Sequence, residues 1–450
     1  MHAVRAAARP LERHHWFLLS VLGAAAFFQG YDLNIVAIAL PQLRHSFGLS
    51  QGDASFWVGL LVLGALPAVF LTRFADRRGR RNVLLISILG YTFATGLTAL
   101  APTIVIFVLC QFTARLFLGT EEAVVWTMVA EELPAESRGF GFGWLAMLVA
   151  LGTGTSAVLY GVVLSPMHLS WRWLYVLALP PLVGVARLRR RLPESRRFSR
   201  SRRQGALSQR WQDILQSPHR HWLILLCLSA VLAGLTTHLV TFGVDFMETQ
   251  RGLSATTSSL LIVAAGAPAL VVLLISGALS DRYGRKLVGC SFASLSVIGA
   301  LSFFFLARSA WSLFLSLTVV FVGSFGARPA LGAFGAELFP TRLRALGGSA
   351  VSAAAVGGQV LSLELGGLLL RWTGSMPDTA AVLVLGPVTM VIVVAFFFPE
   401  THGRELEEIH GEPPFIPSAA DHAPIVPPVG PVGGPGSLIG TPAGREARSD

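Results

Sequence analysis

The chain has 450 residues, and charged residues make up only 13% of it, about half of the roughly 25% that is typical of soluble domains. Hydrophobic residues make up 53%, so a folded core would leave too little polar surface for solution, and the composition indicates a membrane protein. The net charge of +10 raises the possibility of a nucleic-acid partner. The positions of the basic residues along the chain test this possibility.

Twelve apolar segments follow one another along the chain, and most are near the 20 residues that a helix needs to cross a bilayer. We therefore predict an all-α polytopic membrane protein. The segments are residues 16–40, 54–72, 82–100, 103–130, 140–164, 171–188, 221–247, 253–280, 287–307, 310–336, 346–371 and 378–398.

The basic residues alternate between the connectors of these segments. Of the 35 Lys and Arg residues, 28 fall at the termini, on every second connector or at the segment end next to one, whereas the other connectors and the segment ends next to them carry only Arg44, Arg172, Arg251, Arg308 and Arg371. Because basic residues accumulate on the cytoplasmic side, we expect both termini to be cytoplasmic, in a plasma (inner) membrane. Topology thus accounts for the positive charge, and we expect no nucleic-acid partner.

Three motifs occur twice, with offsets of 205 to 206 residues between the copies. DRRGRR at 76–81 returns as DRYGRK at 281–286, the pattern Glu-x-x-Pro-x-x-x-Arg at 131–138 returns at 337–344, and Pro-Glu at 193–194 returns at 399–400. The repeat predicts two six-helix bundles, since parallel repeats of this kind are a known transporter architecture. We assign residues 1–188 and 220–410 to the bundles, 189–219 to a basic cytoplasmic linker and 411–450 to a disordered Pro/Gly-rich tail.

These motifs resemble those of the major facilitator superfamily. TRFADRRGRR (72–81) and GALSDRYGRK (277–286) are similar to its signature loop, and PESRRF (193–198) and PETHGRELEEI (399–409) to the ends of both halves in its sugar-porter and metabolite/proton symporter branches. AELFPTRLRALG (336–347) is similar to a sequence of the synaptic-vesicle-protein-like branch. The resemblance implies twelve transmembrane helices in two pseudo-symmetric bundles. The paired glutamines of sugar porters are absent from the seventh segment, so we do not expect a hexose substrate.

Asp32 lies inside the first apolar segment, where a charge costs at least about 2.5–3.5 kcal/mol. Helix geometry brings it to a depth similar to that of Arg115 in the fourth segment. A carboxylate whose solvation changes as a protein rocks can bind and release a proton. By resemblance, the two residues match the first-helix acid and fourth-helix arginine of proton-coupled sugar porters. A static ion pair that only fixes helix packing is the alternative.

Glu122 and Arg328 occupy equivalent points of the two halves and carry opposite charges. Arg328 is suited to a substrate carboxylate, because a guanidinium group matches that geometry, and a structural pair with Glu122 is the alternative. Lone polar residues in membrane helices more often make packing contacts. The remaining candidates for a substrate cavity are Trp126, His238, which is the repeat equivalent of Asp32, Gln359 and Glu364.

The repeated motifs also place charged residues on the side we assign to the cytoplasm. We interpret them as a gate whose ion pairs close that side, with the general basic bias of cytoplasmic loops as the alternative. We expect Asp76 and Asp281 to accept backbone N–H groups at helix starts. The gate residues are Asp76, Arg77, Gly79, Arg80, Glu131, Arg138, Glu194, Asp281, Arg282, Gly284, Arg285, Glu337, Arg344 and Glu400.

The sequence therefore predicts a secondary transporter, not an enzyme, that moves an organic or aromatic acid by proton symport with alternating access. The alternatives are proton-coupled efflux of amphipathic drugs, or a non-transporting receptor or scaffold with the same fold. No metal-ligand spacing or cofactor motif is found, so we expect neither. The expected partners are a small-molecule substrate, protons and the lipid bilayer, and we expect a monomer.

Overall fold

The computed structural model describes residues 12–68, 70–72, 80–133, 137–189, 217, 219–339 and 343–401. Every regular element within these residues is a helix. They are α1 (Arg13–Ile38), α2 (Leu40–Phe47), α3 (Gln51–Val62), η1 (Leu63–Ala65), α5 (Arg80–Ala99), α6 (Ile104–Glu132), α7 (Arg138–Val158), η3 (Leu159–Leu164), α8 (Arg172–Arg189), α11 (Arg220–Gly234), α12 (Thr237–Thr241), α13 (Gly243–Thr249), α14 (Ala255–Tyr283), α15 (Arg285–Leu301), η4 (Ser302–Leu306), α16 (Ala310–Glu337), α17 (Arg344–Thr373), α18 (Met376–Leu383) and α19 (Leu385–Phe397). The predicted tail and most of the predicted linker lie outside the described residues.

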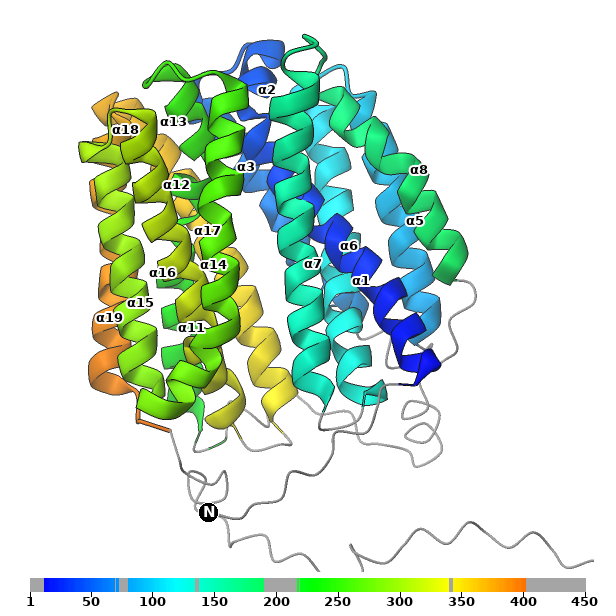
Figure 1. Ribbon diagram of the computed structural model, residues 1–450, viewed down its shortest axis with the longest axis vertical. Coiled ribbons are helices and arrows are strands. Elements are labelled where there is room, and N and C mark those ends of the chain that lie inside the picture. Colours follow the sequence, from blue (N-terminus) through cyan, green and yellow to red (C-terminus); the bar gives the residue numbers. More distant parts are fainter. Residues whose placement is uncertain are drawn as a thin grey trace, which may run out of the picture.

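The expected all-α membrane architecture is confirmed. Eleven helical segments of the described chain are long and apolar enough to cross a membrane. The twelfth is α8, which carries Pro180 and Pro181 and arginines at both ends, and which packs along α5 (Figure 1). Each of the twelve predicted segments thus corresponds to a helical segment of the structure.

The seventh predicted segment is broken into three short helices, α11, α12 and α13. The first break follows Gly234 and the second lies at Phe242, just before Gly243. A Cβ atom on Gly234 would overlap the backbone of Gly358 in α17, so glycine is what allows α11 and α17 to approach this closely.

The helices form two bundles (Figure 1). In the N-terminal half α1 packs on α7 and α5 on α6, and in the C-terminal half α15 and α14 pack on α16 and α11 on α17. The halves meet mainly where α3 packs on α17 and where α7 with η3 packs on α14. We call the end where α1 begins and α19 ends the terminal end, and the opposite end, with α2, α13 and α18, the distal end.

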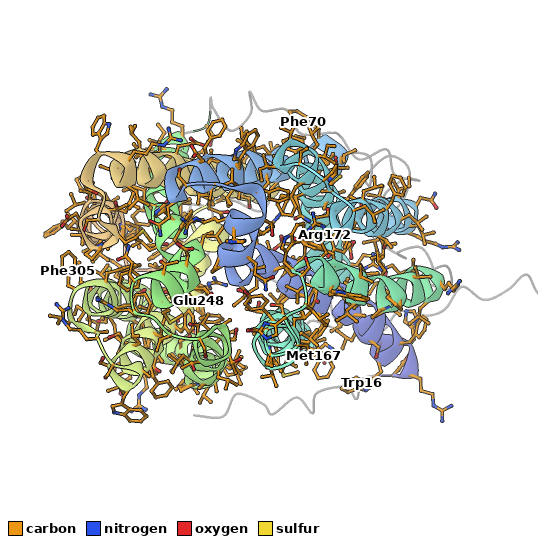
Figure 2. All side chains as sticks on the ribbon, turned by 90° about the horizontal axis from the view of Figure 1, so that it is seen from above. Trp16, Phe70, Met167, Arg172, Glu248 and Phe305 are labelled. Carbon is orange, nitrogen blue, oxygen red and sulfur yellow. The ribbon has the colours of Figure 1, made fainter. Side chains whose placement is uncertain are left out.

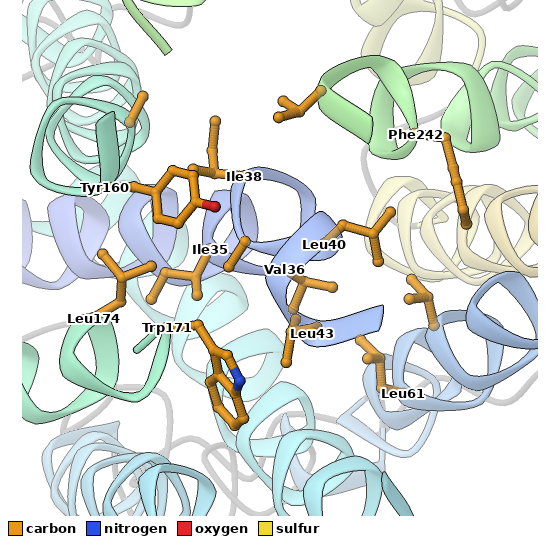
Figure 3. Close-up of a cluster of buried hydrophobic side chains, with 14 of the residues drawn as sticks. Ile35, Val36, Ile38, Leu40, Leu43, Leu61, Tyr160, Trp171, Leu174 and Phe242 are labelled. Carbon is orange, nitrogen blue, oxygen red and sulfur yellow. The ribbon is translucent and has the colours of Figure 1, made fainter. Parts of the chain in front are cut away.

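The buried apolar residues show at which end the halves are joined. One cluster at the distal end combines residues of both halves, among them Ile35, Leu61 and Tyr160 from the first half and Phe242 from the second (Figure 3). Towards the terminal end, the other two clusters of the described residues each belong to one half. The structure is therefore closed at its distal end, and the described residues form no core shared by the halves at the terminal end.

A buried ion pair stabilises the N-terminal bundle. Arg189, the last residue of α8, is fully buried and donates to Glu121 Oε1 of α6 at 2.6 Å and to the carbonyl of Leu84 in α5 at 3.3 Å. This arginine was counted with the linker in the sequence prediction, but its contacts tie together three helices of the bundle. A buried charge that loses its partner is strongly destabilising.

We predict that Glu121→Gln lowers the free energy of unfolding by about 3–5 kcal/mol, because it leaves Arg189 as an uncompensated buried charge. Glu122→Gln is the matched control, since the neighbouring Glu122 is exposed and forms no ion pair among the described residues. Thermal unfolding of both variants in detergent tests the prediction. Equal losses of stability in the two variants would contradict it.

Candidate functional site

Asp32 is fully buried in the C-terminal third of α1. Neither of its carboxylate oxygens has a hydrogen-bond partner among the described residues. Arg115 of α6 lies near enough to act electrostatically on the carboxylate, as the sequence predicted, but the two side chains do not form a salt bridge. The carboxylate therefore has a counter-charge nearby, and Tyr91 of α5 is close enough to act on it as a hydrogen-bond donor, but no described residue forms a regular hydrogen bond or salt bridge with it.

Two buried tyrosines complete the surroundings of Asp32. Tyr91 of α5 and Tyr175 of α8 lie near enough to interact with its charge, and both are almost fully buried. Their hydroxyl groups also lack partners within the described chain. Buried polar groups are normally hydrogen-bonded, so a group of such atoms around one carboxylate indicates a functional site. The sequence analysis did not include these tyrosines, although each is a hydroxyl group in an otherwise apolar segment.

Glu122 and Arg328 face each other across the two halves. Glu122 lies 18 residues after the start of α6 at Ile104, and Arg328 lies 18 residues after the start of α16 at Ala310. Both side chains are exposed despite these mid-helix positions, and they interact electrostatically without forming a salt bridge. The guanidinium of Arg328 lies 4.9 Å from the ring centroid of Phe325. Two accessible, unpaired charges of opposite sign thus lie between the halves.

Three other predicted cavity residues lie at helix contacts. Trp126 is half-buried and packs on Phe142 with ring centroids 5.5 Å apart. Glu364 packs against Gly59, so its carboxylate lies at the contact between α17 and α3. Gln359 is half-buried where α17 meets α11.

His238 is completely buried between the halves. Its Nδ1 lies 2.9 Å from Ser55 Oγ of the N-terminal half, and Ser55 Oγ donates in turn to the carbonyl of Leu363 at 2.6 Å. Because the serine proton goes to that carbonyl, we assign the proton of the His238–Ser55 bond to Nδ1 of the histidine. The ring also stacks on Phe242 at 4.4 Å. In this conformation His238 joins the two halves and does not line an open space.

The described part of the predicted gate forms one cluster at the terminal end of the C-terminal half. Arg285 contacts Asp281 at 2.5 Å and Glu337 at 3.2 Å, and Thr401 Oγ1 donates to Glu337 at 2.6 Å. Arg282 projects outwards over the ring of Tyr283. All of these contacts join residues of the C-terminal half.

Glu400, and not Asp281, accepts backbone N–H groups at a helix start. Its carboxylate accepts the N–H groups of Arg285 at 2.8 Å and of Lys286 at 3.1 Å, at the N-terminus of α15. Asp281 belongs to the last turn of α14, which places it beside the Arg285 side chain instead. Gly284 makes the approach of Glu400 possible, because its φ is +102° and a Cβ atom there would crowd the carboxylate. The expectation for Asp281 was therefore wrong.

The rest of the predicted gate cannot be placed. Asp76, Arg77, Gly79 and Glu194 lie outside the described residues, as do the side chains of Arg80, Glu131, Arg138 and Arg344. Their roles remain predictions.

Charged residues at the distal end form bridges between the halves that the sequence analysis missed. Arg44 Nη1 lies 2.5 and 2.6 Å from the two carboxylate oxygens of Asp245, and Gln51 Nε2 donates to the same carboxylate at 2.6 Å. Arg371 pairs with Asp53 at 2.6 Å. Figure 2 looks onto this end, where the two halves meet near Glu248. The sequence contained one signal for these bridges, because the connectors with few basic residues each carry a single arginine.

One hollow borders Glu400 but lies away from Asp32 and Arg328. It is an open groove of about 730 Å³ between α15 and α19, lined by Lys286, Cys290 and Ile298 among others. Because it contains neither Asp32 nor Arg328, we do not assign the functional site to it.

The sequence model of the Major Facilitator Superfamily matches residues 22–325 and 226–432 of the chain. The chain is 26% identical to the niacin transporter NiaP of Acinetobacter baylyi, over 89% of its own length and 97% of that protein's. It is 27% identical to the gallate transporter of Pseudomonas putida, over 84% and 92% of the two lengths. A crystal structure of a D-xylose-proton symporter has the same fold, with a TM-score of 0.74 at 18% identity over 86% of this chain and 99% of that one. The chain therefore belongs to the Major Facilitator Superfamily, whose members here are membrane transporters and not enzymes.

Proposed function

We propose that the protein imports an organic acid, of the aromatic monocarboxylate class, together with protons. The observation that carries the proposal is the Asp32 carboxylate, which is fully buried beside Arg115 with neither oxygen hydrogen-bonded within the described chain. A carboxylate in such a place can be neutralised by a proton when it is buried and release the proton when its surroundings become hydrated. A static ion pair is less consistent with this geometry, because the two groups do not form a salt bridge.

The pair Glu122 and Arg328 supports an acidic substrate. A secondary transporter binds its solute between its two halves, near the middle of the membrane. Arg328 lies between the halves with an accessible guanidinium group that forms no salt bridge with any described residue. The niacin and gallate transporters carry aromatic acids by name, which favours a carboxylate as the group that Arg328 binds.

The orientation we propose places both termini in the cytoplasm, at the plasma membrane, with the protein acting as a monomer. The support is the distribution of Arg and Lys in the sequence, since 28 of the 35 fall at the termini, on every second predicted connector or at the segment end next to one. The terminal end is then cytoplasmic, and the structure corresponds to a state closed towards the outside. Drug efflux and a scaffold role stay as alternatives, and no described contact favours either.

We predict that Asp32→Asn abolishes uphill accumulation of substrate but leaves exchange between the two sides partly intact, because the amide cannot carry a proton. Nicotinate and gallate are the first substrates to test, in proteoliposomes with an imposed proton gradient. Asp378→Asn is the control, since it removes an exposed carboxylate at the start of α18. Proton-driven accumulation at the parent level in Asp32→Asn would exclude Asp32 from coupling.

We predict that Arg328→Gln weakens binding of an acidic substrate by about 10- to 150-fold, the range for one hydrogen bond to a charged group. A neutral analogue of the same shape, such as nicotinamide beside nicotinate, should lose little. Glu122→Gln should not weaken binding of the acid, because it removes only a like charge. Binding of both ligands to purified variants measures this. Equal losses for the acid and the neutral analogue would rule out the carboxylate role.

A further inference from the structure

We propose that Arg44 and Asp245 form the closing bond of a distal gate, which holds the two halves together in the conformation described here and must break before the substrate site can open at that end. The inference rests on the proposed transport function, but its test needs neither substrate nor proton gradient. The two residues lie in different halves, Arg44 in the short helix α2 and Asp245 in α13.

The geometry of this bond is that of a strong, partly desolvated contact. One nitrogen of Arg44 lies 2.5 and 2.6 Å from the two oxygens of Asp245, whose side chain is 0% exposed, whereas that of Arg44 is 19% exposed. Gln51 of α3 donates to the same carboxylate, so two elements of the N-terminal half bind one residue of the C-terminal half. Hydrogen bonds to charged groups are stronger than neutral ones.

A second carboxylate increases the need for Arg44. Glu248 lies one turn after Asp245 in α13, half-buried, and the two acids interact electrostatically. Like charges this close repel each other. Without Arg44, a fully buried Asp245 would face this repulsion with no cation to offset it, and exposure to water would relieve both penalties. Loss of the arginine should therefore favour opening of the distal end.

Two further contacts lie on the same seam between the halves. Arg371 of α17 pairs with Asp53 of α3, but both side chains are about half exposed, so this pair contributes little on its own. Deeper in the molecule, His238 bonds to Ser55 across the seam. The side-chain hydrogen bonds between the halves that involve Arg44, Gln51, Ser55, Thr256 and Arg371 lie in this distal part. Separation at this end must break every one of them, and the Arg44–Asp245 bond is the one between full charges that is also buried.

The test measures the distance between spin labels at His45→Cys and Arg308→Cys, which are exposed distal positions in the two halves. The three native cysteines, Cys110, Cys227 and Cys290, are replaced first. Double electron–electron resonance in lipid nanodiscs then gives the populations of closed and open distal ends without any ligand. Arg251→Gln is the matched control, because the described partners of that distal arginine, Phe304, Phe246 and Arg308, all belong to its own half.

We expect Arg44→Gln and Asp245→Asn each to raise the ratio of open to closed populations by about 10- to 150-fold, the range for one hydrogen bond to a charged group. The reciprocal variant, Arg44→Asp with Asp245→Arg, should restore the closed distribution, and Arg251→Gln should match the parent. The inference fails if Arg44→Gln, folded as judged by gel filtration and circular dichroism, keeps the parent distribution. It also fails if the reciprocal variant remains as open as the single variants. If Asp245→Asn does not fold, Arg44→Gln and the reciprocal variant decide the question.

Discussion

A charge inside a membrane protein has to be neutralised by a partner side chain, a proton, a solute or water, because leaving it bare costs several kcal/mol. The charged residues that the structure describes differ in the kind of partner that neutralises them. Arg189 has a permanent partner in Glu121, and the pair holds three helices together. Asp32 forms no regular hydrogen bond with a described residue, which suits it to a proton. Arg328 and Glu122 lie between the halves, where a solute can reach them.

The contact between the halves decides which of these charges can be used at a given moment. At the distal end the halves share one apolar core and several polar bonds, so the deep site is shut off on that side. At the terminal end the described cluster around Arg285 and Glu400 stays within the C-terminal half. That arrangement keeps the ends of α14, α15, α16 and α19 together as one rigid unit, which a rocking motion needs. Alternation then depends on bonds that are strong in one conformation and absent in the other.

Much of the fold was predictable from the sequence, because hydropathy reveals the membrane spans and the repeated motifs reveal the two halves. All twelve predicted segments are helical, and Asp32 and Arg115 do lie near each other as the depth argument suggested. The breaks in the seventh segment were not predicted, since glycine is common in membrane helices and does not by itself mark a break. Tyr91 and Tyr175 were missed because spacing along one helix does not say which residue of another helix faces it.

The ion pair between the halves at the distal end could not be predicted from the sequence either. Arg44 and Asp245 lie 201 residues apart and belong to no repeated motif. The sequence patterns identified Arg44 only as one of the few basic residues expected on its side of the membrane. That it binds an acid of the other half depends on how two independently folded bundles meet, which no local pattern encodes. Arg189 was misplaced for a related reason, because an arginine just after an apolar segment is usually solvated.

The shared distal core also bears on electrical insulation. Two rigid halves that touch at one end can open there while they close at the other end. If both ends were open at once, every bond between the halves would be lost. Opening the distal end would also wet Phe242, Tyr160 and the other apolar residues of the joint cluster, a cost that only a new contact at the terminal end offsets. A continuous water-filled path is therefore the least stable arrangement of the two bundles. In the proposed transport cycle, the joint apolar cluster would thus limit leakage of ions through the protein while the bundles change conformation.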